Sequence, residues 1–445
     1  METNDMYAWF RTMRESKPIS FNEQHNEWAV FGYDDVQRVL SDYSTFSSEY
    51  MGTNSPIGSS IISTDPPRHR QLRSLVTQAF TPRTVAQLTP RITAIVNELL
   101  DGAAPSGRMD VIDDLAYPLP VIVIAELLGI PAADRERFKY WSDVVVGAVP
   151  SGGRNPQMEM GQYFLQMIEQ RRQEPADDLI SALLDAQVDG QHLNQLELLG
   201  FCILLLVAGN ETTTNLIGNA VLCFDEHPEV IEQLRAEPAL LSNAIEEVLR
   251  YRSPIKMMFR VATTDTDLNG YMIKEGQGVE AWIASANRDE AQFPDAERFD
   301  ISRSPNRHLA FGYGIHFCLG APLARLEAKI VLEVMLKRLA GMRRVTDVPL
   351  EASASFILNG VKHLPITFER SRRFYKWESR KPSCRQHVAS FLDSHGVLFI
   401  PYQTDQVSQA GLVSSPARRH PFYPLLYGCP RQLLLPQPVL PPSCR

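Results

Sequence analysis

A cysteine framed by glycines stands directly before a long helical run, and this junction constrains the fold more than any other feature of the chain. Residues 311–320 read FGYGIHFCLG, and the run APLARLEAKIVLEVMLKRL follows them. Glycines permit unusual backbone angles, and backbone N–H groups at a helix N-terminus stabilise a negative sulfur. The junction therefore predicts a loop that presents Cys318 as a thiolate at the start of a helix. Taken alone, a free cysteine is more often a small buried core residue, and this alternative remains open.

The first 371 residues show mainly helical periodicity, which is clearest over residues 85–100, 196–223 and 229–250. Shorter β-like runs occupy residues 27–31, 262–268 and 279–284, and Asn269-Gly270 supplies a turn signal. Hydrophobic residues make up 44% of the chain, which is enough to enclose a bulky cofactor. The sequence predicts a mainly α domain with a small β region.

Composition also sets the domain limits and the class of protein. Residues 372–445 are rich in proline and basic side chains, so we expect them to be a tail, without a fold of its own, behind a domain of residues 1–371. A net charge of −8 argues against a general nucleic-acid binder. The N-terminus lacks a signal-peptide pattern, and the longest apolar stretches fall short of the roughly 18–20 residues of a membrane span. We expect a cytoplasmic protein without a membrane anchor.

A second unusual segment, LLLVAGNETTT at residues 204–214, lies inside a long apolar run. Threonine hydroxyls compete for the carbonyl four residues back, and glycine adds backbone freedom, so we expect a local opening of the helix. The structural alternative is a C-cap or a helix bend with a surface glutamate.

An acid and a base, Glu247 and Arg250, are spaced to share one helical face and to form an ion pair. Most such pairs are solvated surface contacts that contribute less than about 1 kcal/mol. On its own this pair is therefore a weak signal.

The glycine-framed segment resembles the haem-binding signature of the cytochromes P450, in which Phe311, Gly312, Gly314, Cys318 and Gly320 occupy the characteristic positions. The resemblance covers residues 7–368 and not the tail. It implies a triangular, helix-rich, haem-enclosing fold around one haem b, with Cys318 as the ligand to the iron. An iron-bound thiolate pushes electron density towards O–O cleavage.

The same resemblance assigns roles to the other segments. Ala208 and Gly209 match the small positions beside the haem, and Glu211 and Thr212 match an acid–alcohol pair that handles protons. Glu247 and Arg250 match a structural Glu-x-x-Arg element, whose third member is expected to be Arg303, with Arg298 as the alternative. The haem propionates need buried donors, and the matching positions are His69, Arg73, Arg260 and His316.

The positions that match substrate contacts are mostly apolar, which suits a hydrophobic small molecule. They are Ile62, Leu205, Ala208, Ile255, Met258 and Leu358. Lys256 interrupts them, and it either receives a substrate carboxylate or packs its stem with the amine in water. The segments at residues 204–220, 284–293 and 315–328 look most like the bacterial family-109 group, which hydroxylates fatty acids, terpenoids and steroids.

The resemblance implies a monooxygenase that uses O₂ and two electrons. Since no flavin or nicotinamide fingerprint accompanies the haem region, we expect the electrons to come from a ferredoxin or flavodoxin with its NAD(P)H-dependent reductase. The basic residues expected to steer such a partner are Arg68, Arg70, Arg325 and Lys329. A peroxide-driven haem-thiolate peroxygenase and a non-catalytic haem-based gas sensor are the alternatives.

Overall fold

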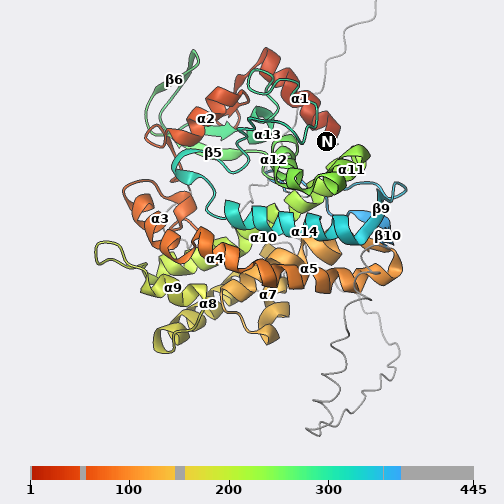
Figure 1. Cartoon of the computed structure of the whole chain (residues 1–445). Coiled ribbons are helices and arrows are strands. Elements are labelled where there is room, and N and C mark those ends of the chain that lie inside the picture. The colour runs from red at the N-terminus through yellow and green to blue at the C-terminus, as the bar shows by residue number, and fades with distance from the viewer. Residues whose placement is uncertain (1–2, 51–56, 146–155, 354, 372–445) are drawn as a thin grey trace, which may run out of the picture. The chain divides into compact units, whose positions relative to one another are not determined.

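The computed structural model describes residues 3–50, 57–145, 156–353 and 355–371, and the predicted tail lies outside the described residues. The described chain is mainly helical, as the sequence predicts (Figure 1). Its α-helices are α1 (Thr3–Ser16), α2 (Tyr33–Ser41), α3 (Arg68–Ala79), α4 (Pro82–Gln87), α5 (Thr89–Ala103), α6 (Pro118–Leu127), α7 (Arg135–Val145), α8 (Pro156–Gln173), α9 (Leu179–Asp185), α10 (Gln195–Glu226), α11 (Pro228–Ala236), α12 (Leu241–Tyr251), α13 (Ile283–Ala286) and α14 (Ala321–Arg338). Short helical turns are η1 (Ile61–Ser63), η2 (Ala104–Ser106), η3 (Ile112–Ala116), η4 (Ala132–Asp134), η5 (Pro238–Leu240) and η6 (Gly314–His316).

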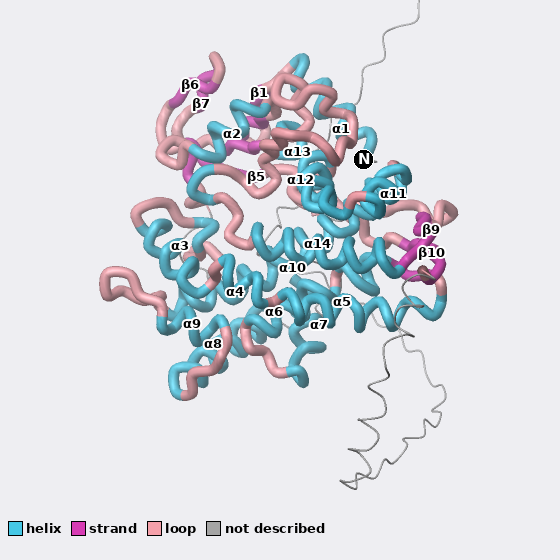
Figure 2. The backbone as a smooth tube through the Cα atoms, in the orientation of Figure 1, coloured by secondary structure: helices cyan, strands magenta, loops and turns pink. Residues whose placement is uncertain are grey.

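The strands form separate small sheets beside the helices (Figure 2). The largest sheet has the order β1-β2-β8-β5-β3, with β2 and β8 parallel and its other neighbours antiparallel. The others are β4-β10-β9 and the hairpin β6-β7. The strand bounds are β1 (Ile19–Asn22), β2 (Glu27–Val30), β3 (Phe46–Ser47), β4 (Arg108–Asp110), β5 (Met258–Ala262), β6 (Thr266–Leu268), β7 (Tyr271–Ile273), β8 (Gly278–Ala281), β9 (Leu339–Arg344) and β10 (Pro365–Arg370).

The predicted turn at Asn269-Gly270 is confirmed, because it joins β6 to β7. Two predicted strands have wrong limits. The run 262–268 is divided between β5, which ends at Ala262, and β6, which begins at Thr266. The run 279–284 covers most of β8 but also enters α13, since a short apolar run does not distinguish a strand from a buried helical turn.

Two predicted helices are broken at prolines. Residues 85–100 divide into α4 and α5 before Pro90, and residues 229–250 divide into α11 and α12 around Pro238. Proline has no N–H for the bond to the carbonyl four residues back, and its ring clashes with that carbonyl. Periodicity continues across each break because helices on both sides bury an apolar face, and therefore it did not reveal the breaks.

The long helix α10 is the central element of the helical body and packs against α6, α8, α12 and α14 (Figure 1). Its start is capped by Asn194 and Glu197, which exchange side-chain-to-backbone hydrogen bonds. One 18-residue window of α10 has a mean hydropathy of 1.4, so by length and composition this helix could cross a membrane. The expectation that no apolar segment is long enough was therefore wrong for α10. Within the structure 61% of that window is buried, as in the core helix of a soluble protein.

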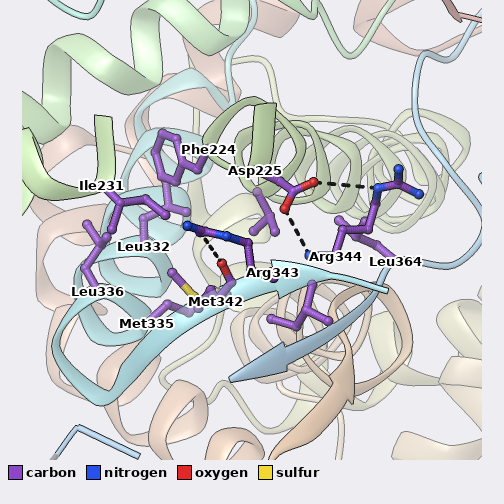
Figure 3. Close-up of a pocket in the computed structure, with 12 residues that line it drawn as sticks. Phe224, Asp225, Ile231, Leu332, Met335, Leu336, Met342, Arg343, Arg344 and Leu364 are labelled. Atoms are coloured by element: carbon purple, nitrogen blue, oxygen red, sulfur yellow. Dashed lines mark hydrogen bonds and ion pairs between the residues drawn. The ribbon is translucent and has the colours of Figure 1, made fainter. Parts of the chain in front are cut away.

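A small pocket of about 10 Å³ lies where the C-terminal part of α10 meets α11, α14 and β9 (Figure 3). Most of its lining is apolar, with Phe224, Ile231 and Leu332 among the residues. At its edge Asp225 accepts a hydrogen bond from the backbone N–H of Arg344 at 3.0 Å and lies 3.7 Å from the Arg344 guanidinium. The volume is about that of one water molecule, so this pocket is a packing feature and not a substrate site.

Candidate haem-thiolate site

The loop before α14 holds Cys318 with backbone hydrogen bonds. The Cys318 N–H donates to the Phe311 carbonyl at 2.8 Å, and the Phe317 N–H donates to the Gly314 carbonyl at 3.2 Å. Gly312 and Gly314 have φ angles of 73° and 72°, in the left-handed region that side chains disfavour. A Cβ on Gly314 would also lie 2.8 Å from the Cα of Ser41 in α2. These glycines are therefore required by the shape of the loop.

Cys318 differs from the other cysteines in the described residues. Burial raises the pKa of Cys202 and of Cys223 to about 12, so both are inert neutral thiols. Burial also raises the pKa of Cys318, but hydrogen bonds from the backbone of Gly320 and Ala321 and the charges of Arg73 and Arg325 oppose this effect. Cys318 is also partly exposed, whereas Cys202 and Cys223 are buried. Among the described cysteines, this environment suits a metal-bound thiolate best.

One face of α10 borders an accessible space. The partly exposed residues between Phe201 and Phe224 recur at helical spacing, whereas the other residues of that stretch are buried. They are Leu204, Leu205, Ala208, Gly209, Glu211 and Thr212. We call these residues the α10 stripe. The stripe contains both members of the predicted acid–alcohol pair and two of the predicted substrate positions.

The structure separates Thr212 from the threonines that follow it. Thr213 and Thr214 are buried, and the Thr214 hydroxyl donates to the Ala116 carbonyl at 3.1 Å. The Thr212 hydroxyl donates to the Ala208 carbonyl at 2.8 Å. This is the competing hydrogen bond that the sequence predicts, yet α10 runs without a break from Gln195 to Glu226. The predicted local opening does not interrupt the helix. A threonine hydroxyl can donate to a helical carbonyl while that carbonyl keeps its backbone hydrogen bond.

Gly209 has a packing role in this structure. A Cβ at this position would lie 2.7 Å from Cδ1 of Ile124 in α6, so the glycine allows α6 and α10 to approach closely. Its backbone still belongs to the α10 stripe. Because a Cβ on Gly209 would meet α6, this direction gives no support for the predicted contact with the cofactor. Ala208 lies on the stripe, and its predicted contact with the cofactor stays a prediction.

The predicted propionate ligands come together from separate segments. His69 and Arg73 lie on α3, Arg260 lies on β5 and His316 lies on η6. The rings of His69 and His316 are 4.5 Å apart between centroids. His316 Nε2 lies 3.1 Å from the Ser48 hydroxyl and 3.6 Å from the Asp65 carboxylate. An open pocket of about 490 Å³ has His69, Arg73 and Ile315 in its lining, whereas Arg260 and His316 do not line it.

This cluster fits the carboxylates of a haem. Both ring nitrogens of His69 are buried and have no hydrogen-bond partner. Burial, together with the charges of His316 and Arg73, lowers the pKa of His69 to about 4, and burial also lowers the pKa of Arg73 and of Arg260. The guanidinium groups of Arg73 and Arg260 stay positively charged and are stabilised by an anion. His69 is neutral at neutral pH, and the one ring N–H of a neutral imidazole can donate to a carboxylate, which would give this buried ring a hydrogen-bond partner.

The Glu-x-x-Arg element forms a fully buried ion-pair cluster. Arg250 donates to both Glu247 oxygens at 2.7 and 2.9 Å, and both side chains are 0% exposed. Arg303, and not the side chain of Arg298, is the third member, since its Nε lies 3.3 Å from Glu247. Arg298 takes part only through its backbone carbonyl, which accepts from Arg250 and Arg303.

Glu247→Gln should lower the free energy of unfolding by about 3–5 kcal/mol, because it leaves the buried Arg250 without its countercharge. Urea denaturation followed by circular dichroism measures the change. Glu232→Gln is the matched control, since it breaks an ion pair of the same spacing in which Glu232 is 74% exposed. The control should cost less than about 1 kcal/mol. Equal losses in the two variants would contradict the structural role of Glu247.

The predicted substrate positions are only partly assembled. Leu205 and Ala208 lie on the α10 stripe, and Ile255 is paired with Leu358 in an isolated β-bridge. Ile62 and Met258 are partly exposed, at η1 and at the start of β5. Lys256 donates a long hydrogen bond of 3.4 Å to the Ser355 carbonyl, and burial lowers its pKa. The described contacts include no carboxylate for this amine, so both interpretations of Lys256 stay open.

Two of the predicted docking cations are engaged inside the protein. Arg68 donates from Nε to Glu197 at 2.8 Å, and Arg325 forms a double hydrogen bond with Glu246. Both side chains remain partly exposed, at 32% and 37%, and their role in steering a partner stays a prediction. Arg70 and Lys329 are exposed and remain available.

Sequence reasoning missed several supporting residues. Asp65 accepts from the Ser47 hydroxyl at 2.6 Å and lies beside His316, and Ser48 is fully buried against the same ring. Their short polar side chains carry no motif of their own. The proximity of Asp65 to His69 in the sequence was the one available signal.

Comparison with known proteins agrees with this geometry. Residues 137–350 match the family model "Cytochrome P450". The chain is 46% identical over 367 residues to "Putative cytochrome P450 YjiB" of Bacillus subtilis, covering 80% of this chain and 93% of the relative. The chain therefore belongs to the cytochrome P450 family, and it is a haem-dependent monooxygenase.

Solved structures place the chain more narrowly. Substrate-free CYP109E1 from Bacillus megaterium is 42% identical and aligns with a TM-score of 0.79 over 83% of this chain and 100% of that chain. The same enzyme in complex with testosterone is 43% identical and aligns with a TM-score of 0.76 over 81% of this chain and 98% of that one. The predicted fold class is confirmed, and the chain is a bacterial P450 similar to the family-109 group.

Proposed function

We propose that this enzyme hydroxylates a hydrophobic small molecule, of the fatty acid, terpenoid or steroid class, with O₂ and two electrons from a separate redox protein. The observation that carries this proposal is the α10 stripe, in which the apolar Leu205 and Ala208 share one face of the helix with Glu211 and Thr212. An apolar lining with a few placed polar groups is typical of a small-molecule site. The complex of CYP109E1 with testosterone supports the substrate class.

The cofactor is haem b, held by Cys318 at the iron and by His69, Arg73, Arg260 and His316 at the propionates. When bound, the haem supplies the activation of O₂ and the insertion of oxygen into the substrate. Phe311 and Gly320 frame the cysteine loop, and Ala208 leaves space beside the cofactor. The unpartnered nitrogens of the buried His69 support this assignment.

Glu211 and Thr212 manage protons at the oxygen-binding side. The Thr212 hydroxyl already donates to the Ala208 carbonyl, so its oxygen is free to accept a hydrogen bond from water or from a neighbouring acid. Glu211 lies next to it on the partly exposed stripe and can exchange protons with solvent. This pair favours oxygen activation over a gas sensor, which needs no proton supply, and over peroxide-driven turnover.

Ferredoxin or flavodoxin, with an NAD(P)H-dependent reductase, is the proposed electron source. Arg70 and Lys329 are exposed on elements that carry or adjoin the haem ligands, α3 and α14. Their charges can attract an acidic partner. We also propose that the enzyme acts in the cytoplasm.

The test is a spectral binding screen of fatty acids, terpenoids and steroids, followed by turnover with a reductase pair. A true substrate displaces water from the iron, which changes its spin state and the absorption spectrum. Product that depends on NADH and the redox pair supports the proposal. Turnover with peroxide alone would identify a peroxygenase, and binding without any product would identify a sensor.

We propose that residues 1–371 are the catalytic domain and that residues 372–445 are not part of its fold. Deletion of residues 372–445 should leave haem content and turnover nearly unchanged, because the family resemblance ends before the tail. Haem absorbance per protein and product formation measure the outcome. Loss of haem incorporation in the truncated chain would assign the tail to the domain.

A further inference from the structure

A second acid on α12, Glu246, joins three separate segments beside the cysteine loop. Its oxygens accept from Arg325 Nε at 2.7 Å and from Arg325 Nη2 at 2.8 Å. Nε2 of His308 lies 3.1 Å from the same carboxylate. Glu246 is 30% exposed, Arg325 is 37% exposed and His308 is 4% exposed. A double hydrogen bond to a planar guanidinium fixes orientation as well as distance.

This arrangement continues into the loop that carries the thiol. The guanidinium carbon of Arg325 lies 4.4 Å from the centroid of the Phe311 ring, within the range of a cation–π contact. His308 Nδ1 accepts a hydrogen bond from the backbone N–H of Ala310 at 3.3 Å. The carbonyl of Phe311 in turn accepts the N–H of Cys318 at 2.8 Å. Glu246 therefore binds both Arg325, which contacts Phe311, and His308, which contacts Ala310, and these two residues belong to the loop that leads to Cys318.

We propose that Glu246, Arg325 and His308 form a clamp that positions Phe311, and through it the backbone of Cys318, against the iron. Glu246 and Arg325 are positioning residues, and this role rests on the proposed function of Cys318 as the iron ligand. The neighbouring Glu247 has a different task, since it binds Arg250, Arg303 and the chain before the cysteine loop.

The electrostatics of Glu246 agree with a permanently charged clamp. Burial raises its pKa, but hydrogen bonds from Arg325 and His308 and the charge of Arg325 outweigh this effect and lower the pKa to about 2. The carboxylate is therefore ionised in the whole working range of pH. Removing its charge releases Arg325 from a fixed orientation and leaves the guanidinium free to move away from Phe311.

The experiment compares Glu246→Gln and Arg325→Gln in the haem-loaded enzyme by the reduction potential of the iron. Electron donation from the thiolate stabilises ferric iron. A loosened loop weakens this donation, so the proposal predicts that the reduction potential becomes more positive in both variants. Simple charge effects predict opposite signs, because one variant removes a negative charge and the other removes a positive one. Opposite shifts of similar size would therefore overturn the proposal.

A second readout is the rate of haem transfer to excess apomyoglobin. We expect it to rise about fivefold in each variant, and no further in the double variant, because both substitutions remove one interaction. Arg325→Lys keeps the charge but loses the planar pair of donors that binds Glu246, so it should show a smaller change than Arg325→Gln. If the increases in the rate of haem transfer added up in the double variant, or if the reduction potentials equalled that of the parent enzyme, the contacts would not position the loop.

Glu333→Gln is the matched control, since it breaks an ion pair with Lys337 on the same helix, where the side chains are 43% and 59% exposed. It should change neither the potential nor the rate of haem transfer. A faster transfer with an unchanged potential in Glu246→Gln would indicate general destabilisation and not positioning. Failure of the ligand assignment itself is detected separately, by the spectrum of Cys318→Ser.

Discussion

Cys318→Ser and Cys318→His should each abolish the red-shifted Soret band of the reduced carbon monoxide complex. That band requires a thiolate opposite the carbon monoxide, and neither a serine hydroxyl nor an imidazole can replace the charge and polarisability of sulfur. The measurement is the difference spectrum of the reduced protein with carbon monoxide minus the reduced protein without it, normalised to haem content. Loss of the band in protein that still contains haem is the expected result.

Cys202→Ala is the control for this prediction. Cys202 is fully buried on α10, and burial raises its pKa to about 12, so it behaves as a small neutral core residue. The control should keep the red-shifted band at full intensity. If Cys318→Ser retained the band, or if Cys202→Ala lost it, the assignment of Cys318 as the ligand would be wrong.

The cysteine loop was predictable because its determinants are local. Gly312 and Gly314 adopt positive φ angles that few other residues tolerate, and the helix that follows begins at Ala321, three residues after Cys318. The positions of these residues within ten consecutive letters of the sequence carry both the backbone geometry and the chemistry. The same holds for the turn at Asn269-Gly270.

Ion pairs between distant segments were not predictable in this way. Glu197 lies 129 positions from Arg68, and Glu246 lies 79 positions from Arg325. Nothing in the local sequence indicates which of these arginines meets an acid and which faces solvent. The fold decides this, since it places α3 beside the start of α10 and places α12 beside α14.

The α10 stripe is an intermediate case. Its spacing is a property of any helix, so residues 204–205, 208–209 and 211–212 could have been grouped on one face from the sequence alone. The same spacing separates Thr212 from Thr213 and Thr214. What the sequence could not supply is the direction of that face, which depends on how neighbouring elements such as α6 and η3 pack against α10.

Thr212→Ala should retain haem and substrate binding but should release reducing equivalents as hydrogen peroxide. The substitution removes the hydroxyl that donates to the Ala208 carbonyl and that we propose to hold a proton at the oxygen-binding side. The measurement is product formed per NADH consumed, with peroxide determined in parallel. Thr214→Val is the control, because its hydroxyl donates to Ala116 on the buried side, so its loss should affect stability and not coupling.

Glu211→Gln should slow the whole cycle, by about 10²–10⁴-fold if Glu211 is the general acid–base group that supplies the protons. The amide keeps the size of the side chain, so substrate and haem binding should be preserved. It cannot, however, pass a proton from solvent towards Thr212 Oγ1. A larger solvent isotope effect on NADH consumption should accompany the slower rate, because proton delivery then limits turnover. The slower NADH consumption distinguishes Glu211→Gln from Thr212→Ala, in which NADH consumption continues and only product is lost. An unchanged turnover rate in Glu211→Gln, together with an unchanged yield of product per NADH in Thr212→Ala, would show that the two residues have only a structural role in the helix.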